Sequence, residues 1–408
     1  MMKKNRKSLF IVSTLLLSII LLSRCINKTE AFNDERGRSY AGSASCRQCH
    51  QAIYDSVLLS AHFNATAPAS RKNIHGKFTA GQNEFAYDTD TKVVMENRDS
   101  GFYQVLYIKG KETAAHRFDI TFGLRNAQTW LYWDNGGTYE LPVSYYTSVH
   151  EWATSPGFSS THPDFKRLIG RDCFECHSSN IKTVINTSLT AEIPETLVRS
   201  SLINGIDCER CHGPSANHVN YHLENPGSKN AMYIVAISKL SKQQKLDMCA
   251  LCHSGNDKRK IESRFNFRPG DTLANFFLEN ANTTNNFDVH GNQFRLMSES
   301  KCFTGSNTMN CSTCHDPHKD ATSNLSFYSQ KCMGCHSEAS HNFCPKADSL
   351  GISIKNNCID CHMPKKPSEA ISFKLAGSTE KSSYLLRTHR IAVYNNETTP
   401  VKADPVNK

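Results

Sequence analysis

The feature that most constrains this chain is the motif Cys-x-x-Cys-His, which occurs seven times in 408 residues. The copies account for 14 of the 17 cysteines, so almost every thiol belongs to one of them. A zinc site pairs two Cys-x-x-Cys units, or one unit with two histidines, and does not need a histidine directly after every second cysteine. Seven is also an odd number of units to pair. The pattern therefore favours neither zinc ribbons nor disulfide bonds.

The spacing instead suits a covalently attached porphyrin. Two thiols three positions apart can each add to a vinyl group of haem, and the histidine that follows then lies beneath the iron as its proximal ligand. We therefore expect seven covalently bound haem c groups, each with its iron, at sites 1 to 7 in chain order. The expected attachment and proximal residues are Cys46, Cys49 and His50 at site 1, Cys173, Cys176 and His177 at site 2, Cys208, Cys211 and His212 at site 3, Cys249, Cys252 and His253 at site 4, Cys311, Cys314 and His315 at site 5, Cys332, Cys335 and His336 at site 6, and Cys358, Cys361 and His362 at site 7.

The stretch CSTCHDPH holds a second histidine, His318, three residues after the motif histidine His315. Haem has one axial position on each face. His318 follows His315 by about one helical turn, too closely to reach the opposite face of the same porphyrin. If His318 binds iron, we expect it to bind the iron of a neighbouring haem. An exposed histidine in a turn is the alternative.

Eleven histidines lie outside the motifs, enough to cap all seven irons on the distal side. Bis-histidine ligation of most haems is therefore predicted, although the sequence does not assign the pairs. The candidate distal ligands are His62, His218, His318 and His389. His222 follows His218 by four residues and shares its helical face. One of these two is expected to bind iron, and the other to lie at the surface or beside a propionate.

The N-terminus predicts export. The basic MMKKNRK is followed by an apolar stretch at 9–22, which suits a signal peptide and is short for a membrane-spanning helix. Cys25 in LLSRC resembles a bacterial lipoprotein box, although Arg24 departs from it. A lipidated Cys25, a cleaved signal and an uncleaved anchor all stay open. We expect a protein in the periplasm, or anchored and facing the periplasm or the cell surface.

Charge argues against a nucleic-acid partner. The formal net charge is +9, and five of the basic residues lie within 1–24, which leaves 9 − 5 = +4 for the rest of the chain. The remaining basic residues are scattered and form no stripe interleaved with aromatic residues. The expected partners are therefore redox proteins or a quinol oxidase system, with membrane attachment through Cys25 as an option.

Motif spacing divides the chain. The long gap between sites 1 and 2 alternates apolar and polar residues, and DNGG at 134–137 is a strong hairpin signal. The mean hydropathy of −0.49 is polar for this length, so haem is expected to fill part of the interior. We expect a mainly α or irregular multihaem cytochrome wrapped around seven c-type haems, with an antiparallel β-rich insert that covers haem 1. The expected regions are 1–24 (signal peptide or lipoprotein signal), 25–76 (N-terminal region with haem 1), 77–150 (β-rich insert), 151–372 (multihaem domain with haems 2 to 7) and 373–408 (C-terminal tail, disordered after about 395).

Three cysteines lie outside the motifs. If Cys25 is lipidated or removed, Cys302 and Cys344 remain as one pair. An oxidising compartment favours a disulfide bond between them, which would join the loops around haems 5 and 6.

The residues around several motifs resemble the multihaem c-type cytochromes whose haem modules are named after cytochrome c-554. The stretches that carry the resemblance are YAGSASCRQCHQAIYDSVLLSAH (40–62), GIDCERCHGPSANHV (205–219), CSTCHDPH (311–318) and CIDCHMPKKPS (358–368). The resemblance implies an exported electron carrier with closely stacked, mostly bis-histidine haems, and it places His62 and His318 at distal-ligand positions. The small tetrahaem carriers lack the β insert, so their function cannot be assigned in full to this chain.

Two functions follow as expectations. The first is electron transfer between redox partners, because bis-histidine ligation leaves no position on iron for a substrate. The alternative is an oxidoreductase for nitrogen or sulfur compounds with one open haem. Related nitrite-reducing cytochromes often carry Cys-x-x-Cys-Lys, which is absent here, whereas hydroxylamine-oxidising relatives keep the ordinary motif. For an open haem, His150 or His162 could serve as acids in the pocket.

Overall fold

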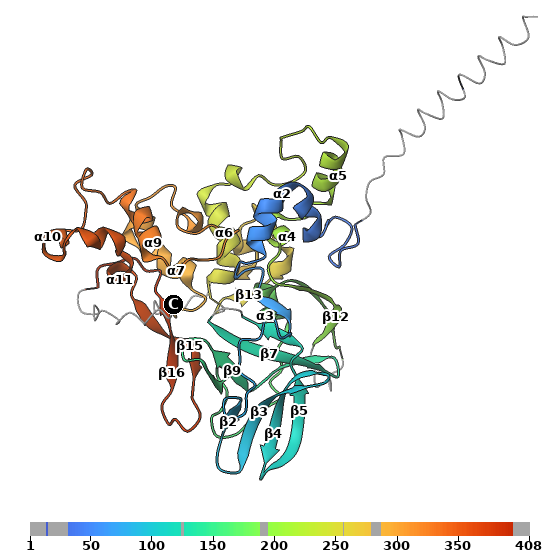
Figure 1. Cartoon of the computed structure of the whole chain (residues 1–408). Helices are drawn as coiled ribbons and strands as arrows, with labels where there is room; N and C mark the ends of the chain where they lie inside the picture. The colour runs from blue at the N-terminus through green and yellow to red at the C-terminus, as the bar shows by residue number, and fades with distance from the viewer. Residues whose placement is uncertain are drawn as a thin grey trace, which may run out of the picture.

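The computed structural model describes residues 32–123, 126–187, 195–255, 257–278 and 287–394, together with Thr14. The expected signal segment, Cys25 and the expected disorder after about residue 395 lie outside these ranges. Short helices lie along one side of the molecule and antiparallel sheets along the other (Figure 1). Within the described residues, no helix is both long and apolar enough to cross a membrane.

Two antiparallel sheets form most of the strand-rich side. A four-stranded sheet has the order β2-β3-β4-β5, and a six-stranded sheet has the order β1-β6-β7-β9-β10 with β8 paired to β7. The predicted DNGG hairpin is present: Asp134 pairs with Gly137, and Asn135 and Gly136 between them have positive φ, as this tight turn requires. The strands are β1 (Thr66–Pro68), β2 (Glu84–Ala86), β3 (Thr91–Arg98), β4 (Gly101–Ile108), β5 (Lys111–Arg117), β6 (Ile120–Phe122), β7 (Ala127–Asp134), β8 (Gly137–Glu140), β9 (Val143–Tyr146) and β10 (Glu151–Thr154).

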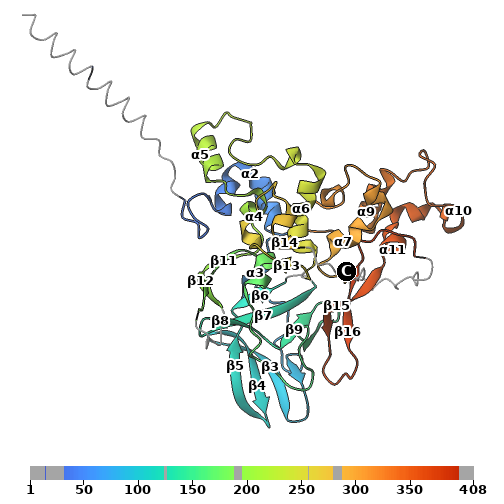
Figure 2. The ribbon, with the colours of Figure 1, turned by 180° about the vertical axis from the view of Figure 1, so that it is seen from behind.

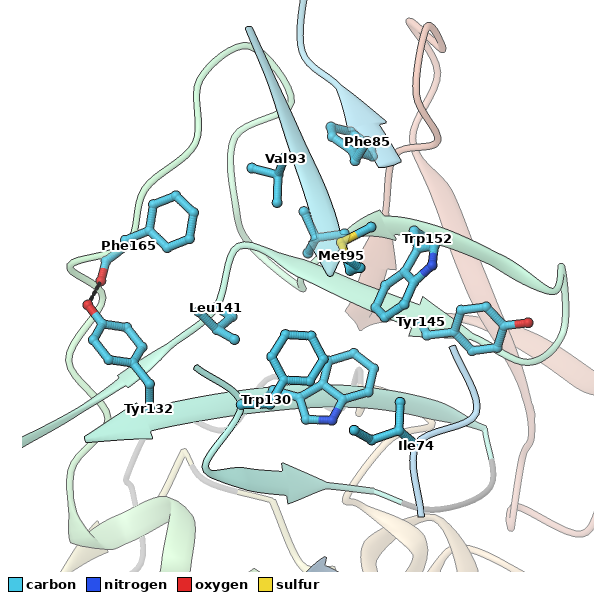
Figure 3. Packing of buried hydrophobic residues seen from close by; sticks show 12 residues of the cluster. Ile74, Phe85, Val93, Met95, Trp130, Tyr132, Leu141, Tyr145, Trp152 and Phe165 are labelled. Atoms are coloured by element: carbon cyan, nitrogen blue, oxygen red, sulfur yellow. Dashed lines mark hydrogen bonds between the residues drawn. The ribbon is translucent and has the colours of Figure 1, made fainter. Parts of the chain in front are cut away.

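An aromatic core fills the space between these two sheets (Figure 3). Phe85 and Met95 come from the four-stranded sheet and face Trp130 of the six-stranded sheet, and all three side chains are fully buried. Each such side chain contributes about 1.5–3 kcal/mol on burial. The Tyr132 hydroxyl donates to the carbonyl of Phe165 at 2.6 Å, so this hydroxyl is satisfied. This side of the molecule thus has a core that does not depend on haem.

The other side consists of short helices separated by loops. The described helices are α2 (Ser43–Val57), α3 (Arg171–His177), α4 (Cys208–His212), α5 (Ala216–Glu224), α6 (Lys242–His253), α7 (Gln293–Ser298), α8 (Lys301–Thr304), α9 (Leu325–Met333), α10 (Ala347–Leu350) and α11 (Ile359–His362). Five 3₁₀ turns join them: η1 (Ile237–Lys239), η2 (Arg264–Asn266), η3 (Leu273–Asn275), η4 (Cys311–Thr313) and η5 (Ile352–Asn356). Seen from behind, α9, α10 and α11 lie at the end of this side that is remote from α5 (Figure 2).

The prediction of a mainly α or irregular fold is only partly confirmed. Three further antiparallel pairs lie outside the expected insert: β11 (Ser178–Ile185) with β12 (Glu195–Asn204), β13 (Arg259–Lys260) with β14 (Phe277–Leu278), and β15 (Lys365–Phe373) with β16 (Ser382–Arg387). These strands are partly exposed and carry many polar residues, so their hydrophobic alternation is weak. The described fold therefore contains β-structure between later motifs and after the last one, as well as in the expected insert between sites 1 and 2.

Gly205, between β12 and α4, has a φ of 65° and packs directly against the backbone carbonyl of Phe63. A methyl group there would meet that carbonyl, whereas the Cβ of an alanine at Gly377, with a φ of 72°, would meet nothing within 4 Å. Alanine is strained by the positive φ at both positions. The difference between the stability losses of Gly205→Ala and Gly377→Ala therefore measures the steric clash at Gly205. We expect Gly205→Ala to lower the free energy of unfolding by about 1–3 kcal/mol more than Gly377→Ala. Equal losses in chemical denaturation would contradict this close packing.

Candidate haem sites

Each motif lies on or beside a short helical turn. Positions i and i+3 share one face of a helix, so the two thiols and the following imidazole of a motif emerge together. Local capping explains where two of these turns begin. At site 3 the carboxylate of Asp207 accepts from the Arg210 amide at 2.8 Å. At site 4 the Ser241 and Gln244 side chains each bond the other residue's amide, which forms a capping box.

Three motif histidines face a second histidine from a distant part of the chain. The ring centroids of His253 and His62 are 6.1 Å apart. Those of His212 and His318 are 5.9 Å apart. Those of His315 and His389 are 6.2 Å apart. In each pair one ring belongs to a motif and the other to a candidate distal ligand.

This separation fits a metal ion held between the rings. An imidazole nitrogen binds a transition metal at about 2 Å, and the ring centre lies about 1 Å behind that nitrogen, so two axial rings have centres about 6 Å apart. The rings of His218 and His222 are only 4.6 Å apart, too close to hold iron between them. The three wider pairs therefore have the donor chemistry and the spacing that bis-histidine haem requires.

Burial favours the neutral form of His62 and His389, the form in which imidazole binds metal. Burial, and after it the charge of His253, lowers the pKa of His62 to about 4. Burial also lowers the pKa of His389 to about 4, with a second contribution from His315. The His62 ring also hydrogen-bonds the carbonyl of Pro317, an outer contact typical of metal-binding imidazoles.

The position of His318 agrees with the expectation that it serves a neighbouring haem. Its ring faces His212 of site 3 and not His315 of its own motif. Its Nδ1 lies 3.4 Å from Oδ1 of Asp316, and its carbonyl accepts from the Ser56 hydroxyl at 2.9 Å. Iron ligation by His318 itself stays a prediction.

The remaining four motif histidines have no such ring pair among the described residues. His218, the fourth distal candidate, is held by a bond of 2.8 Å between its Nδ1 and the Met232 carbonyl, and it lies within electrostatic reach of His50. Nε2 of His222 is buried without a hydrogen-bond partner. The α5 helix therefore brings two imidazoles towards site 1, and which one binds iron stays a prediction.

One histidine near the haem sites was not among the candidates from the sequence. His290 lies within electrostatic reach of His177 and His253, and its burial lowers its pKa. Nothing in its DVHGN context distinguishes it from a turn histidine. His150 and His162, considered as pocket acids, are exposed in turns, and Nδ1 of His162 contacts the Ser159 hydroxyl at 3.1 Å. Their role as acids beside an open haem stays a prediction.

The strand-rich region packs against site 2, and the expectation that it covers haem 1 stays a prediction. The rings of Phe122 and His177 are 5.2 Å apart, and the Thr66 hydroxyl donates to the His177 carbonyl at 2.9 Å. Phe174, inside the site 2 motif, packs in one cluster with Ile120 of β6. The motif phenylalanine thus anchors α3 on the six-stranded sheet, because burial of its ring requires an apolar partner there.

The expected disulfide bond between Cys302 and Cys344 is not formed, and both are free cysteines. Cys302 lies within electrostatic reach of Cys314 and Cys332, the thiols of sites 5 and 6. Helix α8, which carries Cys302, packs through Phe303 into a small apolar cluster. That packing fixes Cys302 beside the motif thiols.

A buried ion network joins the segment before site 1 to site 3. Arg36 pairs with Asp34 at 2.9 Å, Asp207 at 2.8 Å and Glu209 at 3.0 Å. The Glu209 side chain is 1% exposed, and it also accepts from the amides of Ala41 and Gly42. The carboxylate inside the motif CERCH is therefore a structural anchor for the start of α2.

A second buried carboxylate lies in the site 2 motif. Glu175 is fully buried and pairs with Arg171 at 3.2 Å, Lys260 at 3.0 Å and Arg264 at 3.4 Å. The Ser263 hydroxyl donates to the same carboxylate at 2.7 Å. Lys260 also pairs with Asp172, directly before the same motif, so cations and carboxylates together form an ion network beside the attachment thiols of site 2.

Comparisons with known proteins place these features in a class. Residues 147–213, which hold sites 2 and 3, match the family "Cytochrome c554 and c-prime". The chain is 21% identical over 407 aligned residues to the dissimilatory sulfite reductase MccA of Wolinella succinogenes, an alignment that covers 80% of this chain and 50% of that protein. The chain thus spans about half the length of this relative. The fold resembles that of the outer cell wall cytochrome OcwA, with a TM-score of 0.50 and 14% identity over 86% of this chain and 79% of that chain.

The motifs, the facing histidine pairs and these likenesses define a class of protein that holds haem through thioether bonds. The chain is a multihaem c-type cytochrome, and it binds haem c. Its resemblance to the cytochrome c-554 modules agrees with the family match over 147–213. That seven haems are bound follows from the motif count alone and stays a prediction.

Proposed function

We propose that this protein transfers electrons between redox partners through seven covalently attached haem c groups, most of them with two axial histidines. The observation that carries the proposal is the set of three histidine pairs with centroid distances of 5.9–6.2 Å. In each pair the two rings come from different parts of the chain. A metal ion capped on both faces has no position for a substrate, which suits a carrier.

The chain's own residues have defined roles in this proposal. Haem iron supplies a one-electron change between its ferric and ferrous states. The motif cysteines hold the porphyrins, and His62, His318 and His389 cap sites 4, 3 and 5. We assign the cap of site 1 to His218, whose Nδ1 is held by a backbone carbonyl so that Nε2 is available to the metal.

The proposal also covers the location of the protein and its partners. We propose an exported protein in the periplasm, or anchored through Cys25 and facing the periplasm or the cell surface. Its partners would be redox proteins or a quinol oxidase system, without nucleic acid. The basic residues and the apolar stretch at 9–22 support this location, since haem is attached to Cys-x-x-Cys-His motifs after export.

A second candidate is an oxidoreductase with one open site. Two observations favour it. His177 of site 2 has no second imidazole at the 6 Å spacing within the described residues, and a relative of which this chain spans about half is a sulfite reductase. Site 2 also lies against the six-stranded sheet, through Phe122 of β6 and Thr66 of β1.

An optical and EPR titration of the oxidised and reduced holo-protein decides between the two functions. The added ligands are cyanide, carbon monoxide, nitrite, hydroxylamine and sulfite. For a carrier we expect every haem to be low-spin and no ligand to change either spectrum. A high-spin haem that takes up a ligand would overturn the carrier function and leave the oxidoreductase.

A further inference from the structure

Contacts between motifs that are distant in the chain indicate how the haem sites follow one another in space. Sites 1 and 3 are in direct contact. The thiols of Cys46 and Cys208 lie within hydrogen-bonding reach of each other, and the Cys208 amide donates to the Ser43 hydroxyl at 3.2 Å. Each thiol carries one edge of its porphyrin, so adjacent thiols bring two porphyrin edges together.

Site 4 touches three other sites. Its Cys249 thiol meets Cys311 of site 5, and its Cys252 thiol meets Cys176 of site 2. The Cys252 Sγ also lies 4.0 Å from the carbonyl of Glu175 in the site 2 motif. Cys211 of site 3 is the third thiol near Cys249 and Cys252.

The series continues from site 5 to site 7. The rings of His315 at site 5 and Tyr328 in the site 6 helix are 5.4 Å apart. At the next step the Cys358 amide of site 7 donates at 3.0 Å to the hydroxyl of Ser329, which lies in the same α9 helix as Cys332 of site 6. Both views of the ribbon show α2, α4 and α6 followed by α9 and α11 along one side, with α3 between α6 and the sheets (Figures 1 and 2).

We propose that the seven attachment sites form a branched series, 1–3–4–5–6–7, with site 2 attached to site 4 as a side branch. Site 2 meets site 3 through the Arg210 side chain, whose Nη2 donates to the Glu175 carbonyl at 3.2 Å, but its thiol contact is with site 4. Site 2 is therefore not an obligatory step between the two ends. This inference rests on the proposed electron transfer and adds its route.

The test uses EPR on the holo-protein with single distal substitutions. Methionine in place of an axial histidine raises the potential of one haem, so a mild reductant reduces that haem alone and makes it diamagnetic. Its ferric neighbours then lose a magnetic coupling, and their signals change. For His62→Met at site 4 we expect three other haem signals to change, from sites 2, 3 and 5. For the matched variant His389→Met at site 5 we expect two.

Two changed signals for His62→Met would overturn the branch while leaving the proposed function intact. Cys173→Ala and Cys176→Ala remove the attachment of haem 2. When they are added to His62→Met, we expect the number of changed haem signals to fall from three to two. If three signals still change, site 2 is not a neighbour of site 4. If His62→Met raises the potential of no haem, both the order and the axial pairing are overturned. The readout is spectroscopic, so it does not depend on any activity.

Discussion

Replacing His62 with glycine is expected to convert one haem per molecule from a six-coordinate low-spin state to a five-coordinate high-spin state that binds carbon monoxide. His62 faces the motif histidine His253 at 6.1 Å, and it reaches that position from the first turns after site 1. Glycine removes the donor and leaves a vacant face at site 4. The spectrum should therefore change at one haem while the other haems keep their signals.

His162→Gly is the matched control for this experiment. His162 is exposed in a turn and contacts only nearby hydroxyls in the described structure, so its loss should leave every haem low-spin. Optical and EPR spectra with and without carbon monoxide measure both variants. A His62→Gly protein in which all haems stay low-spin and bind no carbon monoxide would show that His62 is not an iron ligand.

Replacing Arg36 with methionine is expected to lower the free energy of unfolding by about 3–5 kcal/mol, because it leaves buried carboxylates without their cation. Asp34, Asp207 and Glu209 all pair with this guanidinium, and their side chains are 8%, 5% and 1% exposed. Arg98→Met is the control, since Arg98 pairs with partly exposed carboxylates at the surface of the strand-rich region. Chemical denaturation should show a large loss for the first variant and almost none for the second.

The loss in Arg36→Met should also depend on pH. Burial raises the pKa of Asp34, but the hydrogen bonds and the charge of Arg36 outweigh it and hold this pKa below its ordinary 3.8. In the native protein this contribution is present above pH 3.8 and is lost as the pH falls through the lowered pKa. Without Arg36, burial is the largest remaining influence on the pKa of Asp34 and Lys182 opposes it only weakly, so protonation of Asp34 favours the folded state. The two proteins should therefore differ most near neutral pH and converge in acid; a difference that grows in acid would contradict this role.

The sequence predicts which residues attach each haem, but not which distant histidine faces each motif histidine. Two thiols and an imidazole within five residues define an attachment site by chemistry alone, and the distance from His315 to His318 already excludes a shared iron. The partner of His62 could not be predicted, because it depends on how α6 packs against the loop after α2. Such a contact joins residues far apart in the chain, and no local pattern encodes it.

The errors in the fold have physical causes as well. The DNGG hairpin was predictable because its turn demands positive φ, which Asn and Gly supply. The β11–β12 and β15–β16 pairs were not, since their strands are partly exposed and alternate weakly. The disulfide bond was predicted from cysteine count and compartment alone, whereas the packing of α8 places the free Cys302 beside sites 5 and 6.

The central claim is that iron lies between paired histidines in several haems, and the EPR spectrum of the fully oxidised holo-protein tests it most directly. The angle between two axial ring planes sets the splitting of the iron orbitals, so crossed planes give a highly anisotropic low-spin signal and parallel planes an ordinary rhombic one. The planes of His62 and His253 are 77° apart, and those of His212 and His318 are 16° apart. We predict both kinds of signal in one spectrum. A spectrum without low-spin signals of both kinds would contradict the pairing of these histidines across iron.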